Sequence, residues 1–258
     1  MINHNFKKKF GQNFISDKNL LSAIVEDGQV DGDEVLEIGA GAGSLTSEIS
    51  KRAKKVVSYE IDKELESELL SLGLGNVKFV FDDVMKYSVA EIEKDFEGEY
   101  KIIANLPYYI TTPIIFKFLN GSKRVQSMTL MVQKEVAERM VAKVGTKDYG
   151  VLSVMLGFFG KTSITRIVDR KMFYPVPNVD SAVVRIDINR EKYQNIDAEK
   201  FFRFIQTCFS MRRKTLKNNL SKLSNPQKLA LIDDEILSKR AEMLSLEQFE
   251  NIFRIFFE

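Results

Sequence analysis

The sequence has few of the side chains that disulfide, zinc and acyl-transfer chemistry require. Its 258 residues include one cysteine, Cys208, and one histidine, His4. A single cysteine excludes a disulfide framework within the chain, and the two residues are too few for a Cys/His metal cluster. A Ser-His-Asp triad would depend on that lone histidine, which makes it a poor hypothesis. We therefore expect neither a metal nor acyl-transfer chemistry.

Long apolar runs are also missing. The longest uncharged stretch near the middle, residues 149–160, is too short to span a bilayer. Near the N-terminus the sequence passes from Lys7, Lys8 and Lys9 into polar residues, without the apolar core of a signal peptide. These absences favour the reducing cytoplasm and no membrane partner, and we separately expect a monomer.

The sequence does contain enough apolar residues for a substantial core. Hydrophobic residues make up 44% of the chain, and its length suggests one large domain or two unequal ones. Strand and helix patterns alternate as far as about residue 190, and only helical spacing follows. We therefore predict domains at residues 1–190 and 191–258, the second small and all-helical.

A strand, a glycine-rich turn and a helix follow one another between residues 34 and 49. Residues 34–38 have the pattern of a short strand, Gly39, Gly41 and Gly43 form the turn, and helical spacing begins near Ser44. Glycines in such a turn let the backbone bend tightly and let a ligand approach it closely. The pattern is typical of the first part of a nucleotide-binding βαβ unit, so we predict an α/β fold with a Rossmann-like sheet.

Acidic residues follow the next two predicted strands. Residues 56–60 end in Glu60, about 20 positions after the first glycine, where a carboxylate can bind both ribose hydroxyls. Asp82 and Asp83 follow a third strand at residues 77–81. This predicts a cofactor with an adenosine half. The NAD fingerprint has a third glycine or alanine at the position that Ser44 occupies here, so NAD is a possible but imperfect match. S-adenosylmethionine has no phosphates for the turn to hold, and it suits this turn at least as well.

The fourth strand ends in the tetrapeptide Asn105-Leu106-Pro107-Tyr108. Right-handed crossovers bring the carboxyl ends of parallel strands to one edge of the sheet, where the four polar strand tips should share one cleft. We expect the next helix to have Thr112 as its cap and Pro113 in its first turn. A simpler interpretation of the tetrapeptide is that Pro107 ends the strand and Tyr108 packs on the core.

Two further segments are candidates for ligand contact. Residues 173–178 form an aromatic loop that Pro175 and Pro177 hold extended, in which Phe173 either packs under the loop or forms a wall of the site. The N-terminal residues 7–14 mix three lysines with aromatic and amide side chains, which is typical either of a solvated tail or of an arm that touches a ligand.

The net charge of the whole chain is only +2, but positive charge is concentrated in the C-terminal region. No acidic residue occurs from Lys200 to Ile232, and the cations there are Lys200, Arg203, Arg212, Arg213, Lys214, Lys217, Lys222 and Lys228. Such a run can be a solvated helix face, but beside a nucleoside site it favours phosphate contact. Asp197 and Ser245 are predicted helix caps, the latter in a capping box with Gln248, and the last helix, residues 249–257, is expected to pack in the core.

Six segments of the chain resemble, in order, the motifs of the small-subunit ribosomal RNA adenine N6,N6-dimethyltransferase family. They are residues 9–14, 37–41, 105–108, 133–136, 179–184 and 212–216, which together span nearly the whole chain. One position departs from the pattern, because Tyr109 stands where the family has asparagine after the tetrapeptide. That leaves the chemistry intact and bears on the rim of the pocket.

The resemblance implies a role for each strand tip. Asn13 and Ile15 would close over S-adenosylmethionine, Gly39 would contact its methionine end, Glu60 its ribose and Asp83 its adenine amino group. The full cofactor set is Asn13, Ile15, Gly39, Gly41, Glu60, Asp83, Val84 and Asn105. The catalytic set is Asn105, Leu106, Pro107, Tyr108 and Phe173, with Tyr108 and Phe173 sandwiching a flipped adenine.

The implied reaction is dimethylation at N6 of two adjacent adenines near the 3′ end of 16S ribosomal RNA, during biogenesis of the small subunit. The substrate would be that RNA within an immature 30S subunit, contacted by Lys7, Lys8, Lys9, Arg212, Arg213, Lys214, Lys217 and Lys222. One alternative is a 23S RNA adenine methyltransferase that confers antibiotic resistance. A second is an RNA-binding assembly factor without turnover, and a third is an NAD-dependent oxidoreductase.

Overall fold

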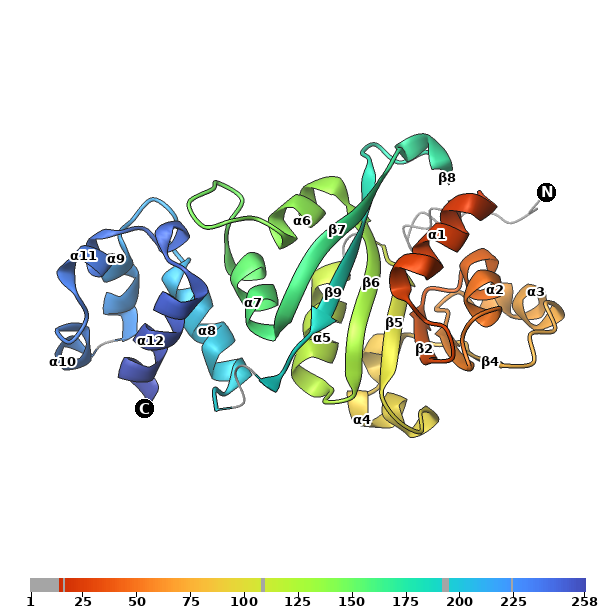
Figure 1. Cartoon of the computed structure of the whole chain (residues 1–258), viewed down its shortest axis with the longest axis horizontal. Helices are drawn as coiled ribbons and strands as arrows, with labels where there is room; N and C mark the ends of the chain where they lie inside the picture. Colours follow the sequence, from red (N-terminus) through yellow and green to blue (C-terminus); the bar gives the residue numbers. More distant parts are fainter. Residues whose placement is uncertain (1–13, 16, 108–109, 192–194, 224) are drawn as a thin grey trace. The chain divides into compact units, whose positions relative to one another are not determined.

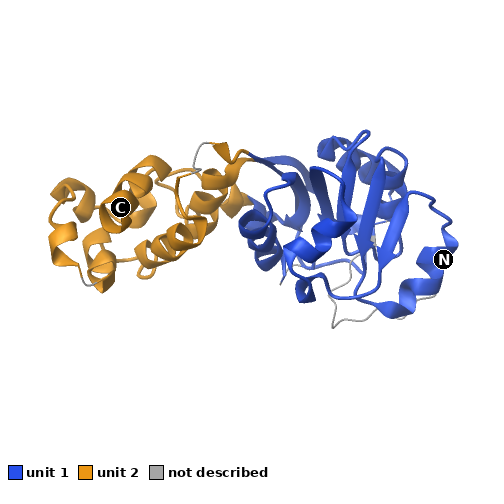
Figure 2. Cartoon of the chain, turned by 90° about the horizontal axis from the view of Figure 1, so that it is seen from below, with its two compact units in different colours: residues 1–137, 163–188 blue, residues 138–162, 189–258 orange. Residues whose placement is uncertain are grey.

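The computed structural model describes residues 14–15, 17–107, 110–191, 195–223 and 225–258. The chain divides into two compact units, which Figure 2 colours separately. Unit 1 comprises Met1–Ala137 and Ser163–Ile188, and unit 2 comprises Glu138–Thr162 and Asn189–Glu258. The chain leaves unit 1 for the last time after Ile188, close to the boundary predicted at residue 190. The sequence did not indicate that residues 138–162 group with the C-terminal part.

A seven-stranded sheet forms the framework of the fold, in the order β4-β3-β2-β5-β6-β9-β7 (Figure 1). The strands are β2 (Glu34–Ile38), β3 (Lys55–Tyr59), β4 (Val77–Val80), β5 (Tyr100–Asn105), β6 (Val125–Gln133), β7 (Gly160–Val168) and β9 (Ser181–Ile188). Strands β4, β3, β2, β5 and β6 are parallel, and β9 pairs antiparallel with β6. The predicted α/β class with a Rossmann-like sheet is confirmed.

Helices cover both faces of this sheet. The described helices before β6 are α1 (Lys18–Gly28), α2 (Ser44–Ser50), η2 (Lys63–Leu65), α3 (Glu66–Ser71), η3 (Val84–Lys86), α4 (Val89–Ile92), η4 (Glu93–Asp95) and α5 (Thr111–Gly121), and α6 (Lys134–Met140) follows β6. In Figure 1, α1 lies in front of the strands and α5 behind them. This alternation is the doubly wound arrangement in which ligands bind beyond the carboxyl ends of the strands.

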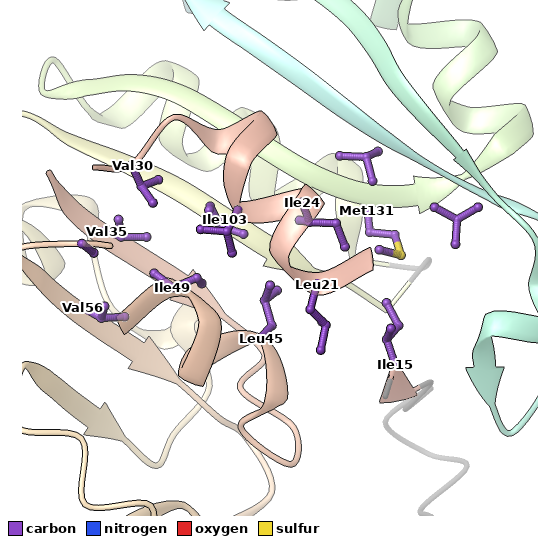
Figure 3. Close-up of a cluster of buried hydrophobic side chains, with 14 of the residues drawn as sticks. Ile15, Leu21, Ile24, Val30, Val35, Leu45, Ile49, Val56, Ile103 and Met131 are labelled. Carbon is purple, nitrogen blue, oxygen red and sulfur yellow. The ribbon is translucent and has the colours of Figure 1, made fainter. Parts of the chain in front are cut away.

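The core of unit 1 lies between α1, α2 and the sheet. In Figure 3, Ile24 of α1 lies beside Met131 of β6, and Leu21 points toward Leu45 of α2 and Ile15. Each fully buried side chain of this kind contributes about 1.5–3 kcal/mol relative to exposure. Ile15 joins the same cluster, so the start of the described chain is anchored to the core.

Unit 2 is built on aromatic packing. Its described elements include α7 (Val151–Phe159), α8 (Ala198–Cys208), α9 (Leu216–Leu220), η7 (Ser221–Leu223), α10 (Pro226–Leu229), α11 (Asp234–Ser238), η8 (Ala241–Met243) and α12 (Leu246–Phe257). Phe201 stacks on Phe158 with ring centroids 4.7 Å apart and meets Phe253 edge-on at 5.3 Å. From Asn189 on, the described residues contain no strand. The predicted core packing of the last helix is confirmed.

The predicted helix caps are partly right. The Asp197 side chain accepts from the Glu199 and Lys200 N–H groups, and Ser245 forms the predicted capping box with Gln248. The cap predicted at Thr112 is wrong, because the cap position is two residues earlier, at Ile110, and α5 begins at Thr111. Pro113 is the third residue of α5, so its predicted place in the first turn is confirmed.

Two elements differ from expectation. From the sequence, no element was assigned to residues 151–165, where the structure has α7 and, from Gly160, the first part of β7. Residues 151–159 are apolar almost all round, so they carry no period that separates a helix from a strand. None of the helices that the structure describes is long and apolar enough to cross a membrane.

Candidate active site at the carboxyl ends of the parallel strands

The register of the parallel strands places the predicted site residues at one edge. Ile38 pairs with both Tyr59 and Ala104, and Tyr59 also pairs with Val80. The residues that follow these positions are the glycine turn, Glu60, the Asp82-Asp83 pair and Asn105. The strand-tip arrangement expected from the sequence is therefore confirmed, whereas the binding roles of its residues stay predictions.

The glycine turn adopts backbone conformations that favour glycine. Gly39, Gly41 and Gly43 have φ of 86°, 56° and 77°. The Gly39 N–H donates to the Tyr59 carbonyl at 2.8 Å, and a Cβ on Gly39 would lie 3.4 Å from the Asn105 carbonyl oxygen. A Cβ on Gly43 would lie 2.4 Å from Leu72 Cδ1. The turn thus passes directly beside the tip of β5, with its backbone close to the strand end.

The Glu60 carboxylate is held by two backbone N–H groups. Oε2 accepts from Gly41 at 2.7 Å, and Oε1 accepts from Asp62 at 2.8 Å. The side chain is buried; desolvation raises the pKa of Glu60, and the two backbone hydrogen bonds oppose that rise. Because a carboxylate has about four lone-pair sites and these N–H groups use two, acceptor capacity remains on both oxygens.

Glu37 lies beneath the turn and was not assigned a role from the sequence. Its Oε2 accepts from the Thr46 and Ser58 hydroxyls, both at 2.6 Å, which joins β2, β3 and α2. Its Oε1 is buried and has no hydrogen-bond partner among the described residues. Burial raises the pKa of Glu37 to about 7, the two hydroxyls act in the opposite direction, and the Glu60 charge adds to the rise. The sequence did contain one indication of a role for Glu37, because a charged residue inside a mostly apolar strand needs hydrogen-bond partners.

Asp83 caps the short turn η3. Its Oδ1 accepts from the Met85 N–H at 2.9 Å, and its own N–H donates to Asp82 Oδ1 at 2.8 Å. Asp83 is half-buried, and Val84 after it is buried. Asp82 bonds Lys86 at 2.7 Å, which together with the Asp83 N–H lowers the pKa of Asp82 to about 2. Asp83 therefore presents a carboxylate oriented by the turn that it caps.

The tetrapeptide is described only in part. Asn105 is the last residue of β5 and half-buried, and Leu106 is 3% exposed. The Pro107 carbonyl accepts from the Ile110 N–H at 3.1 Å and from the Thr111 hydroxyl at 3.4 Å, which joins the loop to the start of α5. Tyr108 and Tyr109 lie outside the described residues, so the predictions made for them stay predictions.

The aromatic loop meets the N-terminal segment. Strand β1 (Phe14–Ile15) pairs antiparallel with β8 (Phe173–Tyr174), and Ile15 lies opposite Phe173. The Phe173 side chain is 3% exposed and belongs to the same core cluster as Ile15. In this conformation Phe173 packs under its loop, the simpler of the two alternatives. The pairing itself joins two segments that the sequence singled out separately; Asn13 lies outside the described residues.

Comparison with known proteins decides the family. A family model described as ribosomal RNA adenine dimethylase matches residues 3–258. The chain belongs to this family. The resemblance read from six motifs is therefore confirmed.

The relatives cover the chain almost completely. It is 40% identical to the ribosomal RNA small subunit methyltransferase A of Mycoplasma mobile, over 99% of this chain and 98% of that protein. It is 44% identical to the protein of the same name from Caldanaerobacter subterraneus, over 95% of each.

Two solved structures are similar at lower identity. A dimethyladenosine transferase from Plasmodium falciparum has a TM-score of 0.79 at 27% identity, covering 93% of this chain and 95% of that one. The 23S rRNA methyltransferase ErmE has a TM-score of 0.72, also at 27%, covering 95% and 100%. The fold is therefore shared with a dimethyladenosine transferase and with a 23S rRNA methyltransferase.

The described cations expected to contact RNA differ in their partners. Arg212 donates to the Lys147 carbonyl, and Lys217 lies 4.0 Å from the Asp234 carboxylate. In unit 2, Arg213 and Lys214 are exposed and make no ion pair with any described residue, and Lys222 donates to the Ser210 hydroxyl at 3.0 Å. Lys200 and Arg203, at the start of the basic run, pair instead with Asp197 and Glu199. The lysines at residues 7–9 lie outside the described part of the chain.

Proposed function

We propose that this protein transfers methyl groups from S-adenosylmethionine to N6 of two adjacent adenines near the 3′ end of small-subunit ribosomal RNA. The observation that carries the proposal is the position of Asn105 at the tip of β5, with its carbonyl beside Gly39 of the glycine turn. An amide side chain at this strand tip would lie between the cofactor edge of the sheet and the space beyond the strand. The family and the small-subunit names of the 40–44% identical relatives support the choice of reaction.

The residues present fit an adenosyl cofactor. Glu60 retains acceptor capacity for two ribose hydroxyls, and the cap geometry of Asp83 leaves Oδ2 for an adenine amino group. The backbone of Gly39 and Gly41 can approach the methionine end because neither carries a side chain. When bound, S-adenosylmethionine supplies an activated methyl group, so the protein needs no strong base.

Asn105 would act by orienting the target nitrogen. The N6 lone pair of adenine is delocalised into the ring, and two acceptors that take its N–H bonds favour a tetrahedral nitrogen whose lone pair points at the methyl group. The Asn105 side-chain oxygen is one acceptor. Because Pro107 already accepts from Ile110 and Thr111, we assign the second to the Leu106 carbonyl. Positioning and charge placement then supply most of the rate.

The target base must leave its stack to reach this edge. We propose Tyr108 as its stacking platform, and we assign Phe173, which packs beneath its loop, to the support of that loop and not to a wall of the site. Ile15, paired through β1 to Phe173, would belong to the cover over the cofactor together with Asn13. The arm and the unit 2 cations would contact RNA phosphates, and we expect a cytoplasmic monomer acting on an immature 30S subunit.

The large-subunit alternative rests on one observation, the likeness to ErmE. The test is to incubate the full chain with labelled S-adenosylmethionine and separated immature small and large subunits, and then map the labelled adenines. We predict label at two adjacent adenines of the small-subunit RNA, and none with the Asn105→Ala variant. Label in large-subunit RNA only would overturn the substrate. RNA binding without label, in the presence of bound cofactor, would favour the assembly factor without turnover.

A further inference from the structure

Lys117 joins the helix that follows the tetrapeptide to the turn that carries Asp83. It lies on α5, half-buried, and its Nζ donates to the Tyr87 carbonyl and, at 3.5 Å, to the Met85 carbonyl. Both acceptors stand at the end of η3, where backbone carbonyls lack partners within the turn. A cation is well suited to these carbonyls because the end of a helical turn carries partial negative charge.

The same turn fixes the Asp83 carboxylate. The Met85 N–H donates to Asp83 Oδ1 at 2.9 Å, while the Met85 carbonyl faces Lys117. Met85 is therefore held from both sides. Any movement of its peptide groups away from α5 would also move the N–H group that orients Asp83.

A second contact holds the following segment to α5. A Cβ on Gly121, the last residue of α5, would lie 2.8 Å from Val89 Cγ2, so the helix end packs directly on α4. Figure 1 shows α4 beside the end of α5. The segment from Asp83 to α4 is thus attached to α5 at two places, by packing at one and by a charged side chain at the other.

The charge of Lys117 interacts with this site. Burial lowers the pKa of Lys117, and the Asp83 and Glu91 carboxylates act in the opposite direction. A purely apolar side chain would satisfy the packing, yet it would leave the two carbonyls without their donor.

We propose that Lys117 is a positioning residue that holds the Asp83 turn against α5 and so sets the preference of the site for the adenine amino group. This deepens the proposed function and rests on it. Lys117 acts through Asp83 and touches neither the cofactor nor the reacting atoms. It would link the adenine end of the site to the helix that starts directly after the catalytic loop.

The experiment measures binding of two probes to the full chain by calorimetry: S-adenosylhomocysteine and its inosine counterpart, in which oxygen replaces the adenine amino group. We expect the wild type to prefer the adenosyl form. Lys117→Met should weaken adenosyl binding by roughly 10-fold and leave inosyl binding nearly unchanged, because the turn that orients the Asp83 carboxylate toward the amino group is no longer held against α5. Lys117→Arg keeps the donor and should restore the preference to within about 2-fold of the wild type.

The double variant Asp83→Ala/Lys117→Met identifies the route of the effect. If Lys117 acts through Asp83, the double variant binds the adenosyl probe no more weakly than Asp83→Ala alone. Equal weakening of both probes by Lys117→Met, an unchanged preference, or additive losses would each overturn the inference. A wild type that binds neither probe would overturn the proposed cofactor instead, and this inference with it. Melting temperatures of all variants show whether a loss reflects unfolding.

Discussion

The charged groups of the two units are held in different ways. At the sheet edge of unit 1, Glu60 and Asp83 are fixed by backbone N–H groups before any ligand arrives. In unit 2, Arg213 and Lys214 are exposed and unpaired among the described residues. Fixed acceptors suit one small ligand of defined geometry, and exposed cations without a partner carboxylate suit a polyanion that can be contacted in many ways. The comparison indicates that cofactor and RNA are recognised by different physical means.

The largest effect on activity is expected at Asn105, where the cofactor and the target adenine of the RNA should meet. Asn105→Ala should slow methyl transfer by roughly 10²- to 10³-fold, because an acceptor for the reacting amino group is lost. Cofactor and RNA affinity should stay within a few-fold, which single-turnover and binding measurements can check. Asn120→Ala, at an exposed position of α5, is the matched control and should change neither. Unchanged transfer in the first variant would refute the catalytic assignment.

Glu37 makes the stability of unit 1 depend on pH. Its folded pKa of about 7 lies above the ordinary value of 4.5, so the stability gained from its proton is fully present below pH 4.5 and is lost as pH rises through about 7. The loss should amount to roughly 3 kcal/mol at most.

Glu37→Gln should remove this part of the pH dependence, as measured by urea unfolding between pH 5 and about 8. The exposed Glu66→Gln should leave it in place. An identical pH profile for the wild type and Glu37→Gln would mean that the acid is not protonated in the folded state.

Glu60 should matter for the cofactor and not for RNA. Glu60→Ala removes two ribose contacts and releases the Gly41 N–H, so S-adenosylhomocysteine affinity should fall roughly 10- to 100-fold. Glu66→Ala again serves as the exposed control. A parallel fall in RNA affinity would show that the two kinds of recognition are not separate.

The smallest effect should come from single cations of unit 2. Arg213→Ala/Lys214→Ala should weaken RNA binding several-fold and reduce the slope of log affinity against log salt by about one per cation. Lys200 and Arg203 are the matched controls because each is already paired with a carboxylate at the start of α8, Lys200 with the Asp197 cap and Arg203 with Glu199. Their replacement by alanine should reduce the slope less. Equal slopes for the two double variants would count against assigning the RNA contact to the unpaired cations.

The features that were predicted correctly from the sequence are those set by residues close to one another along the chain. β2, the glycine turn and Glu60 follow from period and spacing within one βαβ unit, and the Ser245 box is a four-residue signal. Lys117 gave no signal, because its partners Met85 and Tyr87 lie far back in the sequence. The pairing of β1 with β8 was equally hidden, since two-residue strands have no period. Contacts between distant segments are set by tertiary packing, which local patterns do not encode.

The claim that cofactor and RNA are recognised by different physical means is tested most directly by titrating the full chain with each ligand at two salt concentrations. The ligands are S-adenosylhomocysteine and a small-subunit RNA fragment, and the concentrations are about 50 and 200 mM. Cofactor affinity should change by less than about 2-fold, because its fixed partners are buried or half-buried, while RNA affinity should fall by at least about 10-fold. Equal responses of the two ligands to salt would contradict the account.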